Sequence, residues 1–133
     1  MKSVMTKAKE LGAAIAESAV VAELKNAQTA YDTCTALQDK LTEYGANRAA
    51  MGEEFKKEIE KQDPAMLKMI KARIETLGRE IVAFPEYARL SEAQKALQAL
   101  IADVNAEISY AVYGVRPNAE ECTHDCSTCK GCH

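Results

Sequence analysis

The feature that most constrains the fold of this chain is a pair of apolar stripes with the spacing of coiled coils. In both, the apolar positions alternate spacings of three and four residues, first along 67–84 and then along 87–111. Only one position in the second stripe, Gln94, is polar. The stripes consist of Leu67, Ile70, Ile74, Leu77, Ile81 and Phe84, then Tyr87, Leu90, Gln94, Leu97, Ile101, Val104, Ile108 and Ala111. This period predicts two helices that each pack a narrow face against another helix.

Start and stop signals frame these two helices. Asp63 can cap the first of them, and the following proline is tolerated at the first helical position because its missing N–H is no loss there. The second has two candidate starts, Pro85 and a capping box that begins at Ser91. Gly114, with Pro117 shortly after it, predicts its end.

The same helical period predicts three helices in the first half of the chain. The first reaches about Ala16, and Ser18 is placed to cap the second. Asp32 is the expected cap of the third, whose stripe runs on to Ile59 although Arg48 and two glycines weaken its middle. Because the connections are short, consecutive helices should lie side by side.

We therefore predict an all-α fold without strands. It is an antiparallel bundle of about five helices with a long coiled-coil-like hairpin, followed by an irregular cysteine-rich tail. The expected division is a helical domain over 1–115 and a metal-binding tail over 116–133.

Composition limits the core and the partners of this bundle. Of the 133 residues 23 are alanine, only seven are aromatic and none is tryptophan, so the core is thin and part of the stripes should contact another chain. The alternative is a small monomeric bundle with alanine-rich packing. The net charge of −3 disfavours direct binding to nucleic acid. A charged beginning and no run of 18 apolar residues indicate a cytoplasmic protein without a membrane segment.

Four of the five cysteines are concentrated in the last twelve residues. They form the pattern CxxxCxxCxxCH, and thiolates at such spacing select zinc, iron–sulfur clusters or Cu(I). One uninterrupted run fits an iron–sulfur cluster better than zinc, whose structural sites usually join two separate CxxC turns. Three closely spaced cysteines commonly hold such a cluster while a fourth ligand comes from elsewhere, and the close set is either Cys126, Cys129 and Cys132 or Cys122, Cys126 and Cys129. The candidate ligands are Cys122, Cys126, Cys129 and Cys132, with His124 and His133 as further candidates.

Other interpretations of the tail compete with the cluster. The end of the pattern is also the attachment motif of c-type haem, but haem attachment requires export. Zinc, a dithiol that cycles with a disulfide, and reduced thiols without any metal are the remaining alternatives. Cys34 lies far from the tail in sequence, at an expected helix start, and is interpreted as a small apolar filler.

Catalytic chemistry has little support elsewhere in the chain. Both histidines lie in the tail, and no Glu-x-x-His motif of di-iron bundles is present. The acidic pairs Glu53-Glu54 and Glu120-Glu121 are expected to be solvated, and the lysines between 56 and 71 alternate with acids as on a mixed-charge surface. We therefore expect a protein that is not an enzyme.

Several helical segments together resemble a known family. They are 8–18, 24–27, 92–97 and 104–108, and their order and separation over about residues 4–113 are similar to those of the bacterial YlbF/YmcA family of small helical proteins. The cysteine-rich end is similar to that of its YlbF branch.

This resemblance implies a function. Family members form complexes with one another and with YaaT, which carry [4Fe-4S] clusters and modulate RNA processing by ribonuclease Y, with effects on competence, biofilm formation and sporulation. The resemblance would give the cluster-ligand role to Cys122, Cys126, Cys129 and Cys132. The expectation is thus a non-enzymatic regulatory adaptor that forms homo-oligomers, or hetero-oligomers with YmcA-like and YaaT-like proteins. The alternative is a zinc-binding or dithiol/disulfide redox-sensing helical module.

Overall fold

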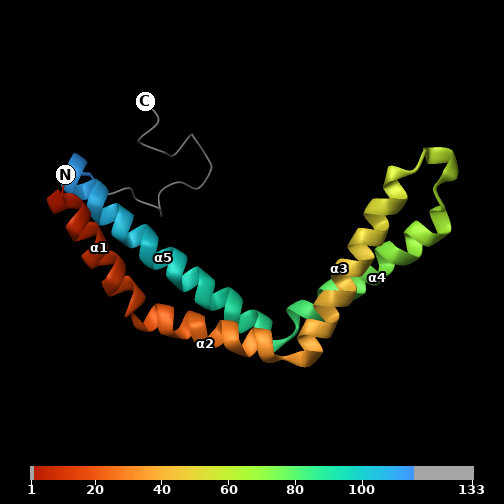
Figure 1. Ribbon diagram of the computed structural model, residues 1–133, viewed down its shortest axis with the longest axis horizontal. Helices are drawn as coiled ribbons and strands as arrows, with labels where there is room; N and C mark the ends of the chain where they lie inside the picture. Colours follow the sequence, from red (N-terminus) through yellow and green to blue (C-terminus); the bar gives the residue numbers. More distant parts are fainter. Residues whose placement is uncertain (1, 116–133) are drawn as a thin grey trace, which may run out of the picture. The chain divides into compact units, whose positions relative to one another are not determined.

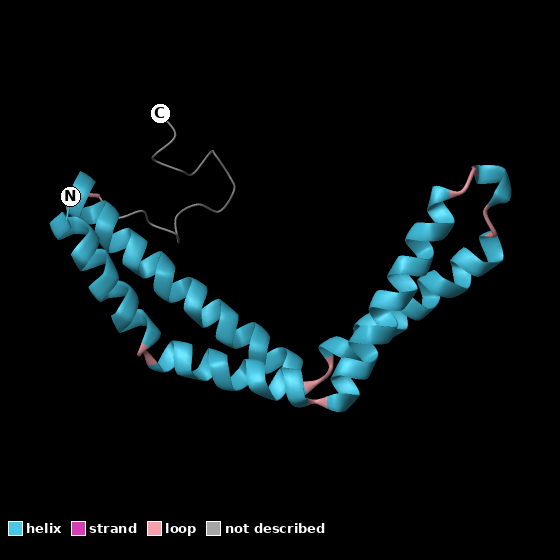
Figure 2. Cartoon of the chain, viewed as in Figure 1, coloured by secondary structure: helices cyan, strands magenta, loops and turns pink. Residues whose placement is uncertain are grey.

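The computed structural model describes residues 2–115, which form five α-helices and one short 3-10 turn (Figure 1). The helices are α1 (Lys2–Ala16), α2 (Ala19–Thr33), α3 (Thr35–Lys56), α4 (Pro64–Val82) and α5 (Pro85–Tyr113), and the 3-10 turn η1 is Ile59–Lys61. The described residues contain no strand (Figure 2). The prediction of an all-α helical bundle is confirmed, whereas the predicted tail lies outside the described residues. The boundary expected at residue 115 therefore stays a prediction.

The junctions around α2 follow the predicted caps at one end only. Ser18 has an extended backbone, and its Oγ accepts a hydrogen bond from the N–H of Val21 at 3.4 Å, as predicted. At the other end α2 continues through Asp32, so the prediction that this residue caps the third helix is wrong. Its carboxylate instead accepts a hydrogen bond from Gln28, one turn earlier in α2, at 2.9 Å. Cys34 occupies the cap position of α3 without a side-chain cap bond.

The connection between α3 and α4 is a short loop that ends in a capped helix start. Asp63 accepts hydrogen bonds from the backbone N–H groups of Ala65 and Met66, both at 3.1 Å, which confirms the predicted cap of α4. The predicted continuation of α3 to Ile59 is wrong, because the helix ends at Lys56. Ile59 lies in η1 with 88% of its surface exposed, so the chain leaves the helical path before this side chain can join the stripe.

The hairpin of α3 and α4 is held by a small core and by ion pairs. Leu37 of α3 and Leu77 of α4 are fully buried, and Ile81 is nearly so. Lys40 pairs with Glu80 across the two helices at 2.8 Å. The members of the predicted stripe on α4 therefore do face α3, as the alternating spacing indicates.

The first half of α5 packs on α2. The helix starts at Pro85, so the capping box at Ser91 is not used. The buried cluster joins Ala27 of α2 to Leu90 and Ala93 of α5. Gln94 of the predicted stripe is exposed, and the buried position is Ala93, one residue earlier. The small Ala93 side chain fits against α2, whereas a buried amide would need hydrogen-bond partners there.

Contacts between Cα atoms divide the chain into two compact units after Leu97, and the described part of the second unit is the end of α5. Here Ile101 and Ile108 of the predicted stripe are exposed, which differs from their expected burial. Gly114 has φ +72°, and its N–H donates to the carbonyl of Tyr110 at 2.8 Å, which confirms the predicted end of the helix. No helix among residues 2–115 has the combination of length and apolar character that a membrane crossing needs.

Candidate functional site

The candidate ligands of the predicted metal site all lie outside the described residues. They are Cys122, His124, Cys126, Cys129, Cys132 and His133. Among residues 2–115, no group of three or more histidine, cysteine or acidic side chains is arranged to hold a metal ion. Cys34 is a free, half-buried thiol at the junction of α2 and α3. The tail site therefore stays a prediction, and the sites that can be described lie on the helices.

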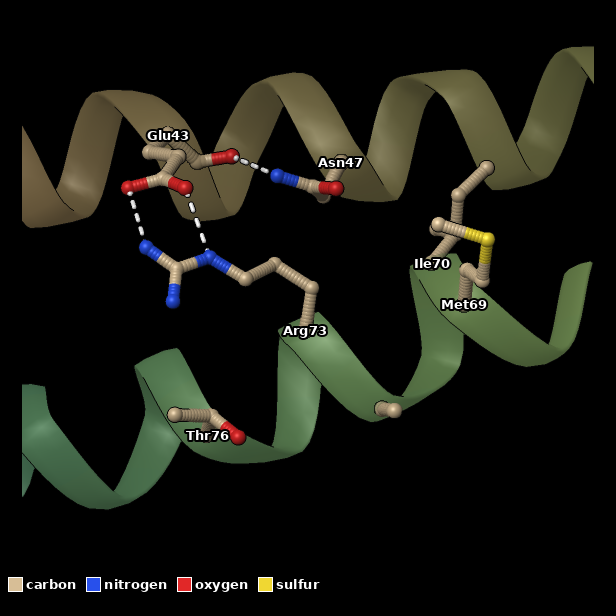
Figure 3. Close-up of a pocket in the computed structure, with 7 residues that line it drawn as sticks. Glu43, Asn47, Met69, Ile70, Arg73 and Thr76 are labelled. Carbon is tan, nitrogen blue, oxygen red and sulfur yellow. Dashed lines mark hydrogen bonds and ion pairs between the residues drawn. The ribbon is translucent and has the colours of Figure 1, made fainter. Parts of the chain in front are cut away.

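A first groove lies between α3 and α4 around one bidentate ion pair (Figure 3). Arg73 donates from Nε to Glu43 Oε1 at 2.7 Å and from Nη2 to Oε2 at 2.9 Å. Asn47 donates to the carbonyl of Glu43 at 2.9 Å, and Met69 and Ile70 form an apolar wall beside the pair. The groove has a volume of about 600 Å³. Its fixed charges and apolar wall suit contact with another protein.

The cross-helix ion pairs change the ionisation of their members. Hydrogen bonding to Arg73 lowers the pKa of Glu43, and hydrogen bonding to Lys40 lowers the pKa of Glu80. Hydrogen bonding to Glu43 also raises the pKa of Arg73. Both carboxylates are thus held in their charged form, which favours a role in fixing the two helices and not in proton transfer.

A second groove between the same two helices shares no lining residue with the first. It has a volume of about 500 Å³. Its walls combine apolar and charged side chains from both helices: Tyr44, Arg48, Met51, Phe55, Lys71, Ile74 and Glu75. The guanidinium of Arg48 lies 5.9 Å from the centroid of the Tyr44 ring. The arginine that interrupts the predicted stripe of α3 therefore lines a surface groove.

Glu54 lies at the loop end of the α3/α4 hairpin, where it is buried although the sequence predicts an exposed side chain. Only 2% of its surface is exposed, so the expectation that the Glu53-Glu54 pair is solvated is wrong for this member. Its Oε1 accepts from the N–H of Asp63 at 2.7 Å, and its Oε2 from Nζ of Lys57 at 2.9 Å. These two hydrogen bonds lower its pKa, the lysine contributing more than the backbone.

A smaller pocket of about 180 Å³ lies between α2 and the first half of α5. The polar side chains that line it are those of Tyr31, Tyr87, Ser91 and Gln94. Burial raises the pKa of Tyr31, and Tyr87 adds to this effect. The phenol is therefore held neutral, and the pocket offers hydrogen bonding without a charged nucleophile or base.

One family comparison identifies the chain. The family described as control of competence regulator ComK, YlbF/YmcA, matches residues 4–113. The chain belongs to this family. The match covers nearly the whole helical part described above and ends before the first tail cysteine.

Membership in the YlbF/YmcA family gives the chain a regulatory role, since the family acts in the control of the competence regulator ComK. It also confirms the resemblance found in the helical segments of the sequence. Neither the curated proteins nor the solved structures contain a match to this chain.

Residues of the grooves were only in part visible from the sequence. The sequence showed that Arg48 interrupts the apolar stripe of α3, and in the structure Arg48 lines the second groove. No spacing rule connects Glu43 to Arg73, which are 30 residues apart, because their pairing depends on the register of two helices joined by a loop.

Proposed function

We propose that this YlbF/YmcA protein is a non-enzymatic regulatory adaptor. It assembles with further copies of itself or with YmcA-like and YaaT-like relatives, and its tail cysteines bind a [4Fe-4S] cluster. Through such complexes it modulates RNA processing by ribonuclease Y, with effects on competence, biofilm formation and sporulation.

The observation that carries the proposal is the incomplete covering of the α3/α4 hairpin. Two helices bury only the side chains between them, and the remaining apolar residues stay on the surface. Within α3 and α4 the most exposed of them is Met69, with 74% of its surface exposed. The large exposed apolar residues of the hairpin and its loop are Phe55, Ile59, Met66, Met69 and Val82. Such a surface is typical of a protein that binds other proteins.

The donor chemistry of the tail supports the cluster part of the proposal. A [4Fe-4S] cluster takes four thiolate ligands, and Cys122, Cys126, Cys129 and Cys132 provide that number. Binding would hold the four cysteines around one cluster and create a surface that exists only in the loaded protein. Assembly would then respond to iron supply or redox state.

The cluster is tested by anaerobic purification without a metal-affinity tag. The sample is analysed for visible absorption and for iron, sulfide and zinc. We expect a brown protein whose colour is lost in the Cys126→Ser/Cys129→Ser variant, while Cys34→Ser serves as the matched control and stays brown. A colourless protein with stoichiometric zinc would favour the zinc or dithiol module instead.

Assembly is tested on the same preparation. Sedimentation of the full chain, alone and mixed with purified YmcA-like and YaaT-like proteins, measures the mass of the complexes. We expect either that the chain alone exceeds its monomer mass of 14.5 kDa, or that at least one mixture contains a species heavier than either component measured alone. A chain that stays monomeric in every mixture would contradict the adaptor role.

A further inference from the structure

We propose that the second groove of the α3/α4 hairpin is a two-fold self-association face. A second copy of this chain packs its own hairpin antiparallel against the first, so that the two hairpins form a four-helix bundle. The inference rests on the proposed adaptor function and names the surface through which the adaptor self-associates.

The charge pattern of α4 points to a second copy. Lys71 and Glu75 lie one turn apart and both line the groove. Neither forms an ion pair within residues 2–115, although Lys56 pairs with Glu53 and Lys95 with Glu92 over similar spacings. Two opposite charges on one face become self-complementary when a two-fold axis passes between them. Lys71 then meets the partner's Glu75, and Glu75 meets the partner's Lys71.

The side chains around that axis suit a buried contact. Ile74 lies between the two charges in sequence and lines the groove with Tyr44 and Met51. The Glu43–Arg73 pair shows that the start of the groove on α3 is level with this part of α4. The same axis therefore passes close to Tyr44 and brings this ring towards the partner's Tyr44. An axis at the level of Lys71 would instead oppose the two copies of this lysine.

A glycine beside the groove gives independent support. Gly45 lies inside α3, where glycine disfavours the helix, and a Cβ atom at this position would meet no atom of the chain within 4 Å. Packing within the chain therefore does not require a glycine at this position. A partner helix that approaches closely at the axis does require one, because the partner helix occupies the space that a side chain at position 45 would fill.

The test is a charge-reversal experiment on the full chain followed by sedimentation equilibrium. Lys71→Glu and Glu75→Lys each convert both cross-axis pairs into like charges, and we expect each to lower the association constant by about tenfold. An equimolar mixture of the two variants should recover the association of the wild type, because every cross-axis pair is then opposite in charge. Lys25→Glu, an exposed change in α2 with the same effect on net charge as Lys71→Glu, should associate like the wild type.

A second variant separates association from folding. Gly45→Gln should increase helix content by circular dichroism and yet weaken association, because the side chain fills the space of the partner helix. Variants that associate like the wild type, or a mixture no better than its components, would overturn this face while leaving the adaptor role intact. A wild-type chain that is monomeric at all concentrations would also overturn it, and the adaptor role would then depend on the mixtures with relatives.

Discussion

The two helix pairs of the first compact unit solve the same packing problem in different ways. The α3/α4 hairpin joins helices that are neighbours in sequence, and it combines large buried leucines with cross-helix ion pairs and a buried carboxylate in its loop. The pairing of α2 with the start of α5 joins segments far apart in sequence through alanines, with one ion pair between Glu23 and Arg89 at 2.7 Å. The hairpin depends on side-chain volume, whereas the α2/α5 pair depends on small side chains that allow a close approach.

Removing volume should therefore affect the hairpin most. Leu77→Ala deletes a fully buried side chain and should lower the free energy of unfolding by about 3 kcal/mol. Leu90→Ala in the α2/α5 pair should cost less, because this leucine keeps 8% of its surface exposed and the other buried members of its cluster are alanines. Urea denaturation followed by circular dichroism measures both values. Equal losses would mean that the two pairs do not differ in this way.

Adding side-chain volume should destabilise the α2/α5 pair more than the hairpin. Ala93→Leu overpacks the contact with Ala27 and should destabilise the protein by about 2 kcal/mol. Gly78→Ala in the hairpin should stabilise it by about 1 kcal/mol, because the new Cβ would meet only the ring of Tyr44 at 4.0 Å and alanine favours the helix. Thermal denaturation of both variants checks the signs. A stabilising Ala93→Leu would show that the α2/α5 contact is loose.

The sequence predicted the hairpin better than the α2/α5 pair for a physical reason. The cap at Asp63 and the stripe through Leu77 depend on local spacing, which a helix reproduces faithfully. The choice of Ala93 over Gln94 depends on which neighbour α5 meets, and that neighbour is far away in sequence. Periodicity alone favoured the position that continued the pattern.

The helical frame, the buried Glu54 and the tail cysteines of the candidate site were predictable from the sequence to different degrees. Family membership and the helical frame could be inferred from residues 4–113; the family comparison confirms the first and the five helices of the structure confirm the second. The burial of Glu54 could not be inferred, because it arises from a loop that returns the N–H of Asp63 to this carboxylate. The cysteine ligands remain a prediction from spacing and donor chemistry.

Cap variants should produce a smaller difference between the pairs. Asp63 accepts two backbone hydrogen bonds at the start of α4, so Asp63→Ala should cost about 1 kcal/mol. Ser18 accepts one long bond at the start of α2, and Ser18→Ala should cost less. Thermal denaturation at neutral pH compares them, with Ser3→Ala as a control at an exposed position of α1. A larger loss for Ser18→Ala would indicate that the hydrogen bond from its Oγ to the carbonyl of Ile15, at 2.6 Å, matters more than the cap.

The smallest expected difference is in the response to acid. The pKa values of Glu43, Glu54 and Glu80 in the hairpin are lowered by their hydrogen-bonded partners, as is that of Glu23 in the α2/α5 pair. A carboxyl group whose pKa is lower in the folded state binds fewer protons there than in the unfolded state. Its stabilising contribution is therefore complete above the ordinary glutamate pKa and is lost as pH falls through the lowered value.

With three such groups against one, the hairpin should loosen more than the α2/α5 pair on acidification. Hydrogen exchange, expressed as protection relative to intrinsic rates, measures each pair separately at neutral pH and below the glutamate pKa. Glu43→Gln should reduce the pH dependence of exchange at the hairpin amides and leave the exchange of the α2 amides unchanged. Glu23→Gln should reduce the pH dependence at the α2 amides and leave the hairpin amides unchanged. Equal loss of protection in both pairs would mean that acid acts on the whole unit, and that the cross-helix ion pairs do not set the difference between them.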